Sequence, residues 1–115
     1  MITISMDYNG RAIEFSLVHH SVDVDFMHLC QSSCQEFSNI SLFLNEHREI
    51  MIKTAGQTQL IIERYGRKRI CKENHPLMLF TNDILWIGEN PVHRFEIIEI
   101  RQVKSSVPRF SWMTR

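Results

Sequence analysis

The sequence of 115 residues predicts an all-β protein. Apolar and polar residues alternate in most segments, which is the pattern of a strand with one buried face. Residues that favour tight turns recur about every 8 to 12 positions, as in a sandwich or a barrel. The composition, 43% hydrophobic and 23% charged, is that of a globular chain and not of a disordered one.

The first three expected strands cover residues 2–6, 13–17 and 22–26. In each of them apolar residues take every second position. Between the first two, the pair Asn9-Gly10 tolerates the positive φ that a two-residue hairpin turn requires. We therefore expect a hairpin at the start of the chain, followed by a third strand with an acidic outer face.

The next segment, residues 30–39, is polar and rich in Ser and Gln, so we expect a loop. A short helix over residues 25–35 is the rival interpretation. It would place Phe26, Leu29 and Cys30 on one face.

From residue 40 onward the strand pattern resumes, with turn residues between the segments. The expected strands are residues 40–44, 49–54, 59–64, 69–71, 77–80, 84–87 and 95–100. The segments 84–87 and 95–100 are apolar on both faces in places, which is typical of central strands between two layers. We expect one β domain over residues 1–103, followed by a tail or linker over residues 104–115. A small β-sandwich and a β-barrel both fit this pattern.

The charge balance argues against binding to nucleic acid or to an anionic membrane. Thirteen Lys and Arg side chains offset thirteen Asp and Glu side chains, so the net charge supplies no attractive field. The first residues lack the basic and apolar regions of a secretory signal peptide. No apolar run approaches the roughly 20 residues of a membrane-spanning helix. We therefore expect a cytoplasmic protein whose three cysteines are free thiols.

No motif in the sequence indicates catalysis. The glycine-rich phosphate loop, the nucleophile elbow and the zinc-protease motif are absent from it. Cys30 and Cys34 do not have the spacing of a zinc knuckle, although a three-ligand set with His28 is conceivable. Cys71 and His75 would have to face each other to act as nucleophile and base. We expect no enzyme, no cofactor and no metal ion.

The strongest candidate for a binding surface is a basic turn. Arg64, Arg67, Lys68 and Arg69 surround a glycine turn between two expected strands. A basic hairpin tip can bind phosphate, either on a phosphorylated partner or on nucleic acid. The alternative is a solvated tip that discourages pairing at a sheet edge. Acidic residues elsewhere would make the surface bipolar, which suits docking to a protein. We expect these four residues to take part in protein docking.

Two stretches of the chain follow the pattern of a known β family. At the start, a strand over residues 2–6 precedes Asn9-Gly10 and the motif Glu14-Phe15-Ser16-Leu17. Towards the end, the order is residues 77–80, the Asn82-Asp83 turn, a strand ending in Ile87-Gly88, and residues 95–98. In these features residues 2–100 resemble the forkhead-associated-like cytosolic domain of the inner-membrane ring protein of type III secretion systems.

This resemblance implies a β-sandwich that docks components of the secretion apparatus at the cytosolic face of the inner membrane. It would reach the membrane through a segment outside this chain, and homo-oligomerisation is left open. Forkhead-associated domains that bind phosphothreonine use a Gly-Arg pair, a Ser-x-x-His motif and a later Asn. Here Gly10-Arg11 and the motif from Ser16 to His19 come too early, so no phosphopeptide-binding residue is carried over.

A second likeness is to the cupin barrel of AraC-type sensor domains. Glu49 and Gly56 have the spacing of the first cupin motif, and His93 matches the last position of the second. The His-x-His pair of the first motif is missing, because Phe43 and Asn45 occupy its places. This likeness implies a metal-free sensor or dimerisation barrel of a transcription regulator. A small toxin-neutralising immunity protein is a third interpretation that the size and neutral charge fit.

Overall fold

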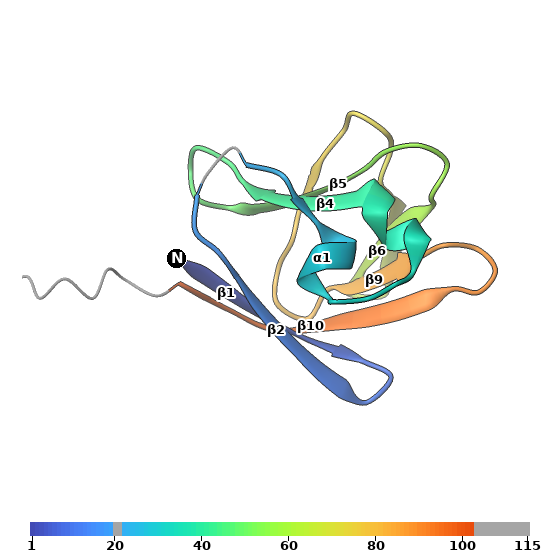
Figure 1. The fold of residues 1–115 in the computed structure, drawn as a ribbon, viewed down its shortest axis with the longest axis horizontal. Helices are drawn as coiled ribbons and strands as arrows, with labels where there is room; N and C mark the ends of the chain where they lie inside the picture. The colour runs from blue at the N-terminus through green and yellow to red at the C-terminus, as the bar shows by residue number, and fades with distance from the viewer. Residues whose placement is uncertain (20–21, 103–115) are drawn as a thin grey trace, which may run out of the picture.

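The computed structural model describes residues 1–19 and 22–102, which form a β-sandwich (Figure 1). Of the described residues, 51% lie in strands and 9% in helices, so the predicted all-β class is confirmed. The elements in chain order are β1 (Ile2–Tyr8), β2 (Arg11–Leu17), β3 (Val24–Asp25), α1 (Phe26–Leu29), the 3-10 helix η1 (Gln35–Asn39), β4 (Ile40–Leu44), β5 (Ile50–Thr54), β6 (Leu60–Arg64), β7 (Arg67–Ile70), β8 (Leu77–Met78), β9 (Ile84–Ile87) and β10 (His93–Gln102).

Two antiparallel sheets make up the sandwich. The larger sheet has the strand order β2-β1-β10-β9-β6-β7, and the smaller has the order β3-β4-β5-β8. In Figure 1, β4 and β5 lie above β1, β2 and β10, and α1 lies between the two layers. The expected tail over residues 104–115 lies outside the described residues.

The core fills the space between the sheets with the apolar residues of the alternating pattern. In β4, for example, Ile40, Leu42 and Leu44 are fully buried, while the residues between them are partly exposed. Phe26 from α1 packs edge-on against Phe95 of β10, with the ring centroids 5.0 Å apart. Burial of such side chains is the main favourable term in folding.

The hairpin predicted at the start of the chain is confirmed. Residues Ile2 to Tyr8 of β1 pair with residues Leu17 to Arg11 of β2 without a break. Asn9 and Gly10 have φ values of 54° and 79°, which are those of the tight turn that the Asn-Gly pair favours.

On its other side β1 pairs with β10, and this pairing contains a β-bulge. Ser5 lies opposite Glu99 and Met6 lies opposite Ile97, which leaves Ile98 as an extra residue. Ile97 is fully buried while Ile98 is 50% exposed. The bulge therefore explains how the strand resumes its alternation after two consecutive isoleucines.

The segments 84–87 and 95–100 lie in β9 and β10, which are central in the larger sheet as expected. We expected both faces of these strands to be covered by a layer of the fold, but side chains alone cover the outer face. Trp86 points outward, donates a hydrogen bond from Nε1 to Glu63 Oε1 (2.9 Å), and lies under the charged ends of Lys68 and Arg94. Long polar side chains, rather than another sheet, shield this indole ring from water.

The expectations for residues 22–39 were partly wrong. The third strand covers only Val24–Asp25, because the Asp25 side chain accepts a hydrogen bond from the Met27 amide (2.7 Å) and starts α1. The rival helix exists but spans only Phe26–Leu29. The expected loop contains η1, which buries Phe37.

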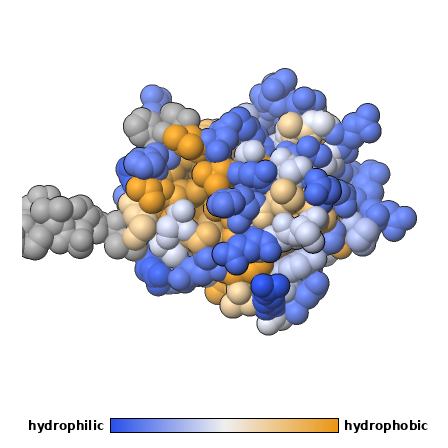
Figure 2. Space-filling view, in the orientation of Figure 1, coloured by the Kyte–Doolittle hydropathy of each residue, from blue (hydrophilic) through white to orange (hydrophobic). Residues whose placement is uncertain are grey.

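The visible surface divides into an apolar and a polar part. In Figure 2, apolar side chains gather on the left of the molecule, and polar ones cover most of the right. Two of the exposed large apolar residues, Val18 and Val22, are 52% and 51% exposed.

Candidate functional site

A groove lies between β7, which ends the larger sheet, and β8, which ends the smaller one. Its volume is about 700 Å³. The lining residues are Ile62, Arg64, Tyr65, Arg67, Arg69, Leu77, Met78 and Phe80. The floor is apolar and the rim carries three arginines, so the groove can receive a ligand with both apolar and acidic groups.

Arg64 is held in place as one wall of this groove. Its Nε and Nη2 atoms donate to the two carboxylate oxygens of Asp83 at 2.8 and 2.7 Å, and Nη2 also donates to the carbonyl of Met78 at 2.8 Å. Its guanidinium lies 4.4 Å from the ring centre of Phe80. These hydrogen bonds with Asp83 raise the pKa of Arg64 above its ordinary value, so its charge is permanent. Arg64 is therefore a structural residue as well as a surface charge.

The other three predicted docking residues divide between the two faces of β7. Arg67 and Arg69 lie opposite Arg64 and Ile62 of β6, on the side of the groove. Lys68 lies opposite Glu63, and its Nζ is 5.2 Å from the Trp86 ring centre on the outer face. Alternation along a strand separates neighbours in this way. The structure thus brings three of the four residues together and places Lys68 elsewhere.

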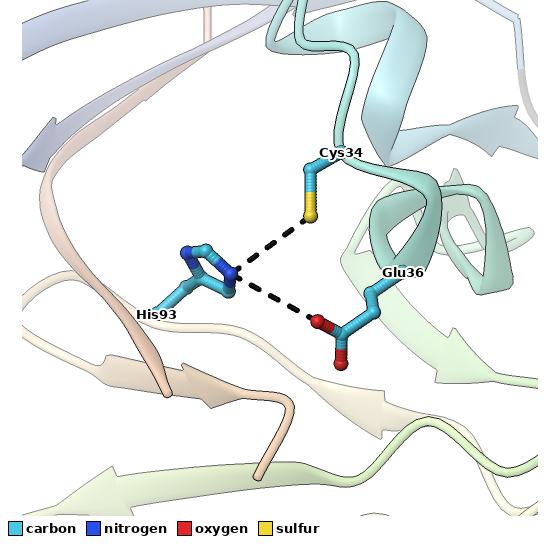
Figure 3. Close-up of side chains that lie close together, drawn as sticks. All are labelled: Cys34, Glu36 and His93. Carbon is cyan, nitrogen blue, oxygen red and sulfur yellow. Dashed lines mark hydrogen bonds and ion pairs between the residues drawn. The ribbon is translucent and has the colours of Figure 1, made fainter. Parts of the chain in front are cut away.

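A second candidate site, separate from the basic turn, is formed by three polar side chains that lie close together. Cys34 precedes η1, Glu36 lies in the first turn of η1, and His93 is the first residue of β10 (Figure 3). His93 Nε2 lies 3.8 Å from Cys34 Sγ and 4.0 Å from Glu36 Oε1. One ligand atom from each residue falls within 4.8 Å of the other two.

Aromatic residues fix the imidazole of His93. Its Nδ1 atom forms a 2.7 Å hydrogen bond with the Tyr8 hydroxyl. The Tyr8 ring stacks on Phe95 with centroids 4.3 Å apart, and the Phe37 ring meets the imidazole edge-on at 4.9 Å. The His93 side chain is only 15% exposed. Both its position and its ring orientation are therefore determined by the core.

The site also depends on a glycine. At Gly88, where φ is +87°, an added Cβ would lie 2.6 Å from Glu36 Oε2 and 3.0 Å from the carbonyl oxygen of Pro91. A residue with a side chain would be strained at this φ, and its Cβ would displace the Glu36 carboxylate.

The arrangement is that of converging ligands and not of a catalytic triad. In a triad the nucleophile and the orienting carboxylate contact different ring nitrogens of the histidine. Here both Cys34 Sγ and Glu36 Oε1 lie near Nε2, and Nδ1 is bonded to Tyr8. A thiol, a carboxylate and an imidazole that face one point are able to hold a metal ion.

The metal set that the sequence made conceivable does not form. His28 is exposed and Cys30 is buried, and burial raises the pKa of the Cys30 thiol to about 12. Cys34 alone of that set joins the cluster. Its actual neighbours are Glu36 and His93, and the latter is distant in sequence, so neither the spacing of cysteines nor any local motif could have indicated this pairing.

The other sequence candidates do not form sites. The Cys71 thiol points to the backbone carbonyl of His75 at 3.7 Å and not to its imidazole, so no nucleophile and base meet there. Ser16 Oγ is 3.0 Å from Thr3 Oγ1 in the hairpin. Gly10 lies in the β1–β2 turn.

Comparison with known proteins gives no match to any family model, curated protein or solved structure. Among the helices of residues 1–19 and 22–102, none has the length and apolar character needed to cross a membrane.

Proposed function

We propose that this chain is a non-catalytic protein-docking domain whose binding surface is the arginine-rimmed groove between β7 and β8. The observation that supports this most directly is the composition of the groove. Leu77, Met78 and Phe80 supply apolar contact area, and Arg67 and Arg69 are exposed on its rim. Within residues 1–19 and 22–102 neither of these arginines forms an ion pair.

The proposed ligand is an extended acidic and apolar segment of a partner protein. Strand β7 ends the larger sheet and pairs with β6 on one side. An extended segment that adds to such an edge gains main-chain hydrogen bonds, and its alternate side chains would point into the groove. Acidic residues on that face would be attracted by Arg67 and Arg69.

The proposed setting is the cytosolic part of a type III secretion basal body. The resemblance of residues 2–100 to the forkhead-associated-like domain of the ring protein supports this proposal, and a β-sandwich is the fold that the resemblance implies. The sensor interpretation is less well supported, since a sensor barrel needs an interior cavity for its ligand. Here, away from the groove at the β7–β8 edge, the space between the sheets is filled by apolar side chains such as Ile52, Leu85 and Phe95.

Charge reversal on the two faces of β7 tests the docking proposal. Arg69→Glu changes the groove, whereas Lys68→Glu makes the same change of charge one residue away on the outer face. We expect Arg69→Glu to weaken binding of a synthetic peptide with alternating Asp and Leu by about tenfold, and Lys68→Glu by less than about twofold. Fluorescence anisotropy measures both, and circular dichroism checks that both variants fold.

The same pair of variants tests whether the domain belongs to a type III secretion basal body. In cells that carry the secretion system, cytosolic components of the apparatus should co-purify with the wild type and with Lys68→Glu, and less with Arg69→Glu. Equal peptide binding by all three proteins would refute the groove as a docking surface. Peptide binding without any secretion component among the partners would retain the groove and refute the setting, and a toxin partner would indicate an immunity protein.

A further inference from the structure

We propose that Cys34, Glu36 and His93 form a binding site for zinc, with three protein ligands and one open coordination position. This site shares no residue with the groove between β7 and β8. The zinc proposal can therefore be tested independently of the docking proposal.

The distances between the three side chains suit a tetrahedral ion. With Zn–S of about 2.3 Å and Zn–N and Zn–O of about 2.1 Å, the edges of the tetrahedron are roughly 3.6 Å for S–N and 3.4 Å for N–O. The corresponding separations are 3.8 Å from Cys34 Sγ to His93 Nε2 and 4.0 Å from His93 Nε2 to Glu36 Oε1. These two separations exceed the tetrahedral edges by about 0.2 and 0.6 Å. The third edge, from Cys34 Sγ to the Glu36 carboxylate, is within 4.8 Å and would shorten to about 3.6 Å on zinc binding.

The hydrogen bond to Tyr8 prepares His93 for this role. A histidine that ligates through Nε2 must carry its proton on Nδ1, and it then needs an acceptor for that proton. The Tyr8 hydroxyl oxygen, 2.7 Å from Nδ1, is such an acceptor. Zinc binding would therefore select one tautomer in an imidazole whose orientation the neighbouring rings already fix.

Charge and chemistry also favour zinc. A thiolate and a carboxylate together balance the two positive charges of the ion, which lowers the free energy of placing it in a half-buried site. Cys sulfur, His nitrogen and carboxylate oxygen are each ligand types that zinc accepts, whereas magnesium and calcium prefer oxygen alone. The exposed edge of the site, where the Glu36 side chain is 38% exposed, leaves the fourth position to water.

Titration with zinc and cobalt tests the proposal on the whole chain under reducing conditions. We expect one equivalent of zinc to raise the melting temperature, since a ligand that binds the folded state stabilises it. We expect cobalt, as a spectroscopic substitute, to produce a thiolate-to-cobalt charge-transfer band. Zinc should displace the cobalt and should protect Cys34 from alkylation.

Substitutions distinguish zinc binding at this site from nonspecific zinc binding by exposed histidines and carboxylates. Cys34→Ser and His93→Gln should each weaken zinc binding by about 100-fold or more, and Tyr8→Phe by about tenfold, because it removes only the partner of Nδ1. His47→Gln is the matched control, since His47 and Glu46 form a His–Glu pair at 3.6 Å that is exposed and has no cysteine. This control should bind zinc as the wild type does.

Some of these variants remove packed side chains, so Glu36→Gln, which changes a partly exposed residue, is measured beside them. It should fold normally and should weaken zinc binding by at least tenfold. The absence of a thiolate-to-cobalt band in the wild type would overturn the proposal. Zinc affinity unchanged in Cys34→Ser and Glu36→Gln, or reduced equally in His47→Gln, would overturn it as well.

Discussion

At the scale of single residues, the basic turn shows that four similar charges can have different tasks. Arg64 is bound to Asp83, Arg67 and Arg69 line the groove, and Lys68 covers Trp86. The strand alternation of β7 follows from the sequence. The sequence does not indicate that Asp83 is the partner of Arg64, because the two residues become neighbours only when β6 pairs with β9.

The ion pair of Arg64 and Asp83 is expected to be important for stability. Asp83 is 1% exposed, and its Oδ2 also accepts the amide of Phe80 at 2.9 Å. Asp83→Ala leaves Arg64 Nε and the Phe80 amide without this acceptor and should lower the free energy of unfolding by about 3 kcal/mol. Arg64→Ala should lower it at least as much, because it leaves a carboxylate buried without its cation.

Urea unfolding measures these losses. Glu99→Ala is the control, since Glu99 pairs with Arg101 at 3.3 Å where both side chains are more than half exposed. Its loss should stay below about 0.5 kcal/mol. A loss of that small size for Asp83→Ala would contradict the assigned role of the buried pair.

At the scale of elements, strands were easier to predict than the segment that connects them. The alternating runs gave β4, β5, β6 and β9 nearly to the residue. Residues 24–39 were harder, because a four-residue helix and a 3-10 helix are too short to establish an apolar period. Their formation depends on the Asp25 cap and on the burial of Phe26 and Phe37, which is a property of the packed core.

The bulge in β10 leads to a prediction about deletion. Without Ile98, the strand would read Phe95, Glu96, Ile97, Glu99, Ile100, in which every second residue is apolar. The pairs Met6–Ile97 and Ser5–Glu99 would then be neighbours in an unbroken ladder. We expect the deletion to retain the fold and to lower the free energy of unfolding by less than about 2 kcal/mol.

Deletion of Ile61 from β6 is the comparison. There the pairing is one residue to one on both sides, so loss of one residue reverses the faces of all that follow. Circular dichroism and denaturant unfolding should show a folded protein for the first deletion and an unfolded one for the second. Unfolding of both would mean that the bulge itself is required.

At the scale of the whole molecule, the sequence indicated the fold class but not the convergence of distant residues. The two sheets follow from period-two patterning. The cluster of Cys34, Glu36 and His93 depends on how the end of the β9–β10 connection meets η1. That is a matter of three-dimensional packing that no local pattern encodes.

The buried thiols should make global stability fall at alkaline pH. Burial raises the pKa of Cys30 from 9.0 to about 12, so above pH 9 the unfolded chain loses this proton while the folded chain retains it. The stabilisation is complete below pH 9 and is lost as the pH rises towards 12, by about 1.4 kcal/mol per pH unit. Denaturant unfolding over this range measures the slope.

Cys30→Ala removes the titrating group and should make that slope shallower by about the same amount, whatever its effect at neutral pH. Parallel slopes for the wild type and the variant would show that other groups cause the loss.

The central position of β10 has a consequence for how the chain is made. β1 and β10 are neighbours in the middle of the larger sheet, so a ribosome delivers one of them early and the other only after the remaining strands. Until then one side of β1 offers unpaired amides and carbonyls, and β6, β7 and β9 have no link to the first hairpin. Closure of the sheet is therefore a single late event with high contact order. Before β10 is in place, the unpaired edge of β1 can form hydrogen bonds with strands of other chains that are still being synthesised, so aggregation is most favoured at this stage.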